Sequence, residues 1–165
     1  MKHGPIKRAS TLFLKAVIVL LGIGVVTMCV FLFPELWTAG IRDVPEFTHV
    51  YYPAMIGVFL TTIPFFFGLY QAFILLHYID TNEAFSELSV KALMLIKYCA
   101  VAMSVLYAVA MPFVYVFAEL DDAPGAILMG VAIVVAPLIV AVFAAVLQKL
   151  VQSAIDMKLE NDLTV

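Results

Sequence analysis

The sequence carries little charge for its length, and this shortage excludes an ordinary soluble fold. Only 13% of its 165 residues are charged and 65% are hydrophobic, whereas about a quarter of the residues in a typical soluble domain are charged. Charge is absent altogether from residues 16–34, 50–76, 98–118 and 123–147. Because a hydrocarbon layer about 30 Å thick needs roughly 20 apolar helical residues, each stretch is long enough to cross it. The sequence therefore predicts an integral membrane protein.

The same stretches lack the ionisable groups that proton relays, ion pathways and intramembrane catalysis require. Their polar side chains are hydroxyls and an amide, for example Thr61, Gln71 and Ser104. The 3 histidines are scattered, with no pair at metal-binding spacing, and no glycine-rich phosphate loop is present. We therefore expect no enzymatic activity, no metal site and no cofactor.

Only 2 cysteines are present, Cys29 and Cys99. They fall near opposite ends of their stretches, so most of the membrane thickness would separate them. A disulfide requires Cα atoms about 4.4 to 6.8 Å apart, which excludes a bridge within the chain. We expect both to behave as small apolar side chains, although the position of Cys99 near a helix end leaves palmitoylation open.

The fold class follows from the hydrocarbon environment of these stretches. Hydrocarbon offers the backbone no hydrogen-bond partner, so a chain crosses it as helices or as a closed barrel, and stretches that are apolar all round exclude the barrel. We predict an all-α, integral membrane four-helix bundle forming a single domain over residues 1–165. Its transmembrane helices lie at about 12–34, 50–78, 92–118 and 123–148, with a loop at 79–91 and a helix or tail at 149–165. Pro64, Pro112 and Pro137 are candidates for kinks.

The distribution of positive charge predicts the orientation. Of the 9 lysine and arginine residues, all but Arg42 fall before the first stretch, between the second and third, or after the fourth. Because such residues stay on the cytoplasmic side, both termini and the 79–91 loop are predicted to be cytoplasmic, in a multi-pass protein of the plasma membrane. The alternative for the basic N-terminus is a cleaved signal peptide, but residues near Ala39 make a poor cleavage site and favour a retained anchor.

Small residues four apart predict where two helices meet, since they let backbones approach closely. The candidate packing residues are Ala100, Ser104 and Ala108 in the third stretch and Ala126 and Gly130 in the fourth. In the second stretch an aromatic residue recurs every seven positions, at Tyr52, Phe59, Phe66 and Phe73. This aromatic stripe is either a groove for a lipophilic ligand or, more simply, packing surface.

The 79–91 loop is the most informative polar segment. Thr81 or Asn82 is predicted to cap a helix that runs on into the third stretch. The candidate partner-binding residues are Asp80, Glu83, Phe85, Glu87 and Leu88. Their two apolar side chains can anchor a protein partner beside acidic groups, or can lie against the inner membrane surface. After the fourth stretch an apolar stripe that includes Leu150 and Met157 predicts a helix that projects from the membrane.

Several segments together resemble a family of small bacterial membrane proteins, catalogued as domain of unknown function 2975 and frequent in Gram-positive bacteria. These segments are Ile63–Phe66, Tyr70–Phe73, Ala84–Ser86, Ser89–Leu93 and Glu119–Gly125. The resemblance covers nearly the whole chain and assigns no catalytic residue. It implies an association with a small helix-turn-helix regulator of the Cro class, because family members are often encoded beside one.

We therefore expect a membrane-anchored regulatory or sensor protein whose partners are the lipid bilayer and a cytoplasmic helix-turn-helix regulator. The chain should not bind nucleic acid directly, since its cytoplasmic parts lack a basic patch. One alternative is an immunity protein against a membrane-active peptide, attracted by the acidic outer residues Glu119, Asp121 and Asp122, which can equally form a solvated turn or collect a cation. Another is an accessory subunit of a transporter. A homo-oligomer is compatible with each of these three functions.

Overall fold

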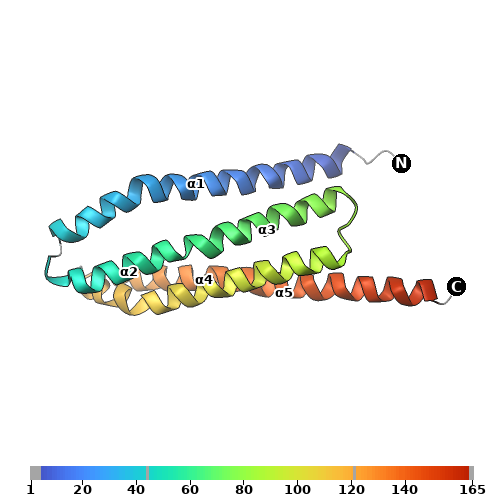
Figure 1. The fold of residues 1–165 in the computed structure, drawn as a ribbon. Coiled ribbons are helices and arrows are strands. Elements are labelled where there is room, and N and C mark those ends of the chain that lie inside the picture. Colours follow the sequence, from blue (N-terminus) through green and yellow to red (C-terminus); the bar gives the residue numbers. More distant parts are fainter. Residues whose placement is uncertain (1–4, 44, 121, 164–165) are drawn as a thin grey trace.

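A computed structural model describes residues 5–43, 45–120 and 122–163, which form helices joined by short turns (Figure 1). The elements are α1 (Pro5–Asp43), the short 3-10 helix η1 (Pro45–Phe47), α2 (Thr48–Leu60), α3 (Thr62–Asp80), α4 (Glu87–Leu120) and α5 (Gly125–Leu163). No strand occurs in these ranges. Four helical segments are long and apolar enough to span a membrane: α1, α2 with α3, α4, and α5. This confirms the all-helical, membrane-spanning fold class.

The second predicted helix is interrupted at Thr61, between α2 and α3. Pro64 explains the break, because proline has no N–H to donate to the carbonyl of Leu60, four residues earlier. The Thr61 hydroxyl donates to the Val58 carbonyl at 2.6 Å, which satisfies a backbone acceptor beside the interruption. By contrast, Pro112 and Pro137 lie within helices that continue through them. Only the first of the three predicted kink sites therefore divides a helix.

Two turns end their helices in the same way. Asn82 after α3 and Asp122 after α4 have positive φ angles of 63° and 49°. In the first turn the Glu83 N–H donates to the Tyr78 carbonyl at 2.8 Å, and in the second the Ala123 N–H donates to the Ala118 carbonyl at 2.9 Å. A left-handed residue with this six-to-one hydrogen bond is the Schellman ending, for which asparagine is a common substitute for glycine.

The start of α1, the α3–α4 turn and the end of α5 lie at one end of the molecule, and the α1–α2 and α4–α5 connections lie at the other (Figure 1). The 79–91 loop is thus on the same side as both ends of the described chain, while its location in the cytoplasm stays a prediction. With 39 residues, α5 is about 58 Å long at about 1.5 Å per residue. This exceeds the hydrocarbon thickness of about 30 Å, so α5 is longer than a membrane span requires.

The tightest packing joins α4 to α5. Most of the buried side chains on the two helices are small, among them Ala100 and Ser104 of α4 and Ala141 of α5, and Gly130 of α5 is also buried. The Ser104 hydroxyl donates to the Val134 carbonyl of α5 at 2.8 Å. A Cβ atom on Gly130 would lie 2.8 Å from the Met111 sulfur and 3.3 Å from a Val114 methyl carbon, so only glycine fits without a shift. These contacts bring the backbones together as small residues allow.

The five candidate packing residues do not behave alike. Ala100, Ser104 and Gly130 are buried, Ala126 is half-buried, and Ala108 is exposed. The stripe on α4 therefore leaves the contact with α5 after Ser104. Spacing by four drifts around a helix of 3.6 residues per turn, which is why a third member of the series turns away.

The residues of the aromatic stripe have two kinds of surroundings. Tyr52 and Phe59 pack against aromatic rings of α1, whereas Phe66 and Phe73 line a hollow. At one end of α1, Phe33 lies 4.7 Å from Phe59 and Trp37 lies 4.5 Å from Tyr52, measured between ring centroids. Near the other end of α1, Lys15 forms an ion pair with Asp80 of α3. Among the side chains described for α1 none is buried. Between these two ends α1 also approaches α3, since a Cβ atom on Gly22 would lie 3.2 Å from a Leu69 methyl carbon.

A pair of glycine substitutions tests the α4–α5 contact. Gly130→Leu should lower the free energy of unfolding by about 1 to 3 kcal/mol, because it overpacks a close helix contact. Gly24→Leu is the matched control, since a Cβ atom there meets no atom within 4 Å. Thermal unfolding in detergent should show a lower midpoint for the first variant only. An unchanged midpoint for Gly130→Leu would mean that this face of α5 contacts lipid and not α4.

Candidate functional site

The α3–α4 turn is held by hydrogen bonds from serine side chains. Ser86 accepts the Ser89 N–H on its hydroxyl oxygen at 3.3 Å, and so caps the start of α4. Ser89 has no exposed surface, and its hydroxyl donates to the Glu83 carbonyl at 3.0 Å. The predicted capping role of Thr81 or Asn82 is therefore wrong. Both residues end α3 instead, because a Schellman turn separates the two helices.

The outer side of this turn combines apolar and acidic side chains. Phe85 is 68% exposed and Leu88 is 47% exposed, and the side chains of Glu83 and Glu87 are exposed beside them. The next turn of α4 is different, since Val90, Ala92 and Leu93 are buried. The start of α4 thus packs its own core on one side and presents Phe85 and Leu88 on the other. We call Glu83, Phe85, Glu87 and Leu88 the turn surface.

Asp80 does not belong to this surface, because its carboxylate is already bound. Beyond the last apolar turn of α3, it forms an ion pair with Lys15 of α1. The Lys15 ammonium also lies 5.7 Å from the centre of the Phe73 ring. Asp80 therefore joins α1 to α3.

The far part of α5 forms a second exposed surface at the same end of the molecule (Figure 1). Leu150, Met157 and Leu163 are exposed along it. Where α5 passes α4, Lys97 donates to the Gln148 side-chain oxygen at 3.1 Å. The last part of α5 extends past the α3–α4 turn (Figure 1), so the exposed apolar residues near its end are available to a partner or a membrane surface.

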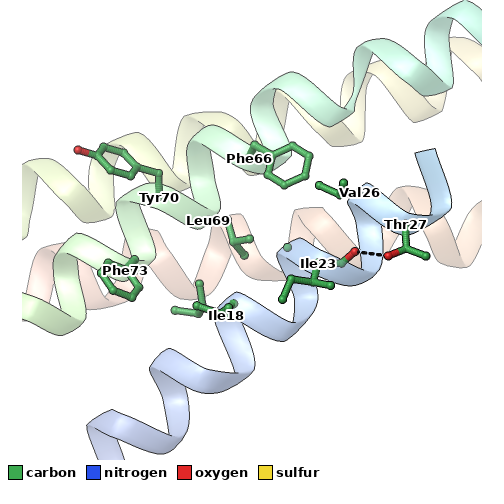
Figure 2. A pocket seen from close by; sticks show the side chains of 10 residues that line it. Ile18, Ile23, Val26, Thr27, Phe66, Leu69, Tyr70 and Phe73 are labelled. Carbon is green, nitrogen blue, oxygen red and sulfur yellow. Dashed lines mark hydrogen bonds between the residues drawn. The ribbon is translucent and has the colours of Figure 1, made fainter. Parts of the chain in front are cut away.

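Two hollows lie between the helices. The first has a volume of about 460 Å³ and lies between α1 and α3, where Ile18, Phe66, Leu69 and Phe73 line it (Figure 2). Its one side-chain hydroxyl on α1, that of Thr27, donates to the Ile23 carbonyl at 2.8 Å. The second hollow has a volume of about 610 Å³ and is lined by residues of α1, α3, α4 and α5, with Thr61 and Tyr107 among them.

The remaining candidate chemistry is sparse. Among the described residues no three histidine, cysteine, aspartate or glutamate side chains are grouped so that they could hold a metal ion. Cys29 and Cys99 are both free. In the acidic cluster before α5, Glu119 accepts a hydrogen bond from the Tyr115 hydroxyl at 2.5 Å, Asp122 is exposed, and Asp121 lies outside the described residues.

Four membrane-spanning helices joined by short turns place this chain in the class of small multi-pass membrane proteins. The chain belongs to the family described as protein of unknown function (DUF2975), which matches residues 35–165, and the resemblance seen in the sequence is thereby confirmed. It is 53% identical over 158 residues to the uncharacterized membrane protein YoaS of Bacillus subtilis (strain 168), covering 96% of this chain and 99% of that relative. No solved structure matches the chain.

Removal of the Ser89 hydroxyl should loosen the turn surface. In Ser89→Val the Glu83 carbonyl loses its donor inside the turn, and a buried group left unpaired costs about 1 to 3 kcal/mol. Hydrogen exchange followed by mass spectrometry should show at least about fivefold faster exchange in residues 82–90, since 1 kcal/mol corresponds to about that factor. Ser153→Val, an exposed position on α5, is the control. Equal exchange in both variants would show that Ser89 does not hold the turn.

Proposed function

We propose that this protein is a membrane-anchored regulator that binds a basic, cytoplasmic DNA-binding protein of the helix-turn-helix class through its turn surface. The observation that carries the proposal is Phe85, a large apolar side chain that is 68% exposed on a turn with a fixed backbone. Exposed aromatic side chains of this kind are the usual anchors of protein interfaces. The family association with such regulators supports the same class of partner.

The surroundings of Phe85 favour a basic partner. Glu83 and Glu87 are exposed next to it, and carboxylates at the rim of an apolar anchor speed the approach of a positively charged protein and select it over others. A DNA-binding protein uses its lysine and arginine residues to neutralise phosphates. Binding to the turn surface would then compete with binding to DNA, and release of the regulator would return it to its operator.

The same charges argue against the simpler possibility that Phe85 and Leu88 only rest on the membrane. The cytoplasmic leaflet carries a negative surface potential, which repels Glu83 and Glu87. The turn is also ordered before any partner arrives, because the Ser86 and Ser89 side chains hydrogen-bond within it. A preorganised surface loses less conformational entropy on binding, which raises its affinity.

Copurification tests this proposal. Phe85→Ala combined with Glu87→Lys should reduce recovery of the DNA-binding partner by about 30-fold or more, as for the loss of a hot-spot residue worth about 2 kcal/mol. The wild-type chain, solubilised in detergent, should capture a basic helix-turn-helix protein that free operator DNA releases. Truncation after Asp156 is the control, because it removes the exposed end of α5 and leaves the turn surface intact.

Three outcomes would contradict the proposal in different ways. Loss of the partner only on truncation would move the site to α5. Retention of the partner by both variants would exclude both surfaces. Capture of a transporter subunit that DNA does not release would favour the accessory-subunit alternative. As a control, fractionation should show that every variant is inserted in the membrane.

A further inference from the structure

The larger hollow is a cavity inside the membrane-spanning part of the bundle. Its volume of about 610 Å³ falls within the range of about 300 to 1,000 Å³ that small-molecule sites occupy. Leu21 and Val25 of α1 form one wall, Pro64 and Gly68 of α3 another, and Pro137 of α5 a third.

The chemistry of the wall excludes a charged ligand. None of the 18 lining residues is lysine, arginine, histidine, aspartate or glutamate. An ion brought to this depth without a partner would be costly, so charged phospholipid headgroups and carboxylates do not fit. The occupant must therefore be neutral and mostly apolar.

One polar group is built into the cavity. Thr61 is only 3% exposed, and its hydroxyl oxygen lies 2.6 Å from the Val58 carbonyl oxygen and 3.2 Å from the Tyr107 hydroxyl oxygen. A carbonyl can only accept, and threonine has one hydroxyl proton. When Thr61 gives its proton to Val58 in the shorter contact, Tyr107 must give its own proton to Thr61.

This hydrogen-bond arrangement determines which polar group of a ligand the Tyr107 hydroxyl can bind. With its proton directed to Thr61, the Tyr107 oxygen keeps lone pairs that can accept a hydrogen bond and has no proton left to donate. A ligand with an O–H group would be held there, whereas a ligand that can only accept would gain nothing. At the other end of the cavity lie Ile96 and Cys99, which are suited to contact with a hydrocarbon chain.

We infer that this cavity binds a neutral long-chain alcohol, with its hydroxyl donating to the Tyr107 oxygen and its chain extending along the surfaces of α3 and α4 towards Cys99. The occupant would enter from the bilayer past α1, the helix without buried side chains among those described. The inference does not depend on the proposed function, since it involves no cytoplasmic partner.

Photolabelling of the purified full chain in phosphatidylcholine nanodiscs tests the inference. The probe is hexadecanol with a diazirine in its chain, and the comparison probes are its methyl ether and the matching hydrocarbon. The alcohol should label peptides of α3 and α4 about threefold to tenfold more than the ether does, which is the advantage expected from one hydrogen bond. Tyr107→Phe should reduce labelling by the alcohol to the level of the ether and leave labelling by the hydrocarbon unchanged.

A second pair of variants tests whether the probes occupy the cavity. Ala72→Phe places a ring in the cavity and should abolish labelling of α3 and α4 by all three probes. Ala102→Phe, at an exposed position of α4 that does not line the cavity, should leave labelling unchanged. Unaltered labelling of Ala72→Phe, or equal labelling by alcohol and ether in the wild type, would overturn the inference. Thermal unfolding of each variant confirms that the bundle is intact.

Discussion

The close approach of α4 and α5 sets the positions of the other elements. A Cβ atom on Gly130 would lie 2.8 Å from the Met111 sulfur, so a larger residue there would require Met111 to shift, and Ser104 reaches the backbone of α5. With α5 on one side of α4, α3 packs on another, and α1 reaches the bundle mainly through α3. The outermost helix is therefore fastened by aromatic rings near one end and by the Lys15–Asp80 pair near the other, and two hollows remain beside it.

Both proposals depend on α3 and α4, at different depths. Thr61 precedes α3 and borders the cavity, while Asp80 ends α3 and leads into the turn that presents Phe85. The turn owes its shape to local chemistry, since Asn82 accepts a left-handed conformation and Ser89 binds the Glu83 carbonyl. These local hydrogen bonds thus hold a turn that leaves the apolar side chain of Phe85 exposed.

Hydropathy was sufficient to predict the membrane-spanning helices, because hydrocarbon leaves the backbone no other state. Small-residue spacing placed Ser104 and Gly130 at a helix contact but also included Ala108, which is exposed. The sequence favours Thr81 or Asn82 as the cap because these residue types often begin helices, but they can also end them, as they do here. The Ser86-x-x-Ser89 pattern that starts α4 lacks the glutamate of a capping box, so it is harder to recognise. The Lys15–Asp80 and Thr61–Tyr107 contacts join residues 65 and 46 positions apart, and no local pattern reveals such pairs.

A cytoplasmic partner can bind the turn surface only if that surface faces the cytoplasm, and cysteine labelling in intact cells measures this. In a background without Cys29 and Cys99, a thiol is placed by Arg42→Cys in the last turn of α1 or by Lys91→Cys near the start of α4. These two helix ends lie at opposite ends of the bundle (Figure 1). A membrane-impermeant maleimide should label the Arg42→Cys protein in intact cells and the Lys91→Cys protein only after permeabilisation. Labelling of the Lys91→Cys protein in intact cells would contradict the account, because the turn surface would then lie outside and could not meet a DNA-binding protein.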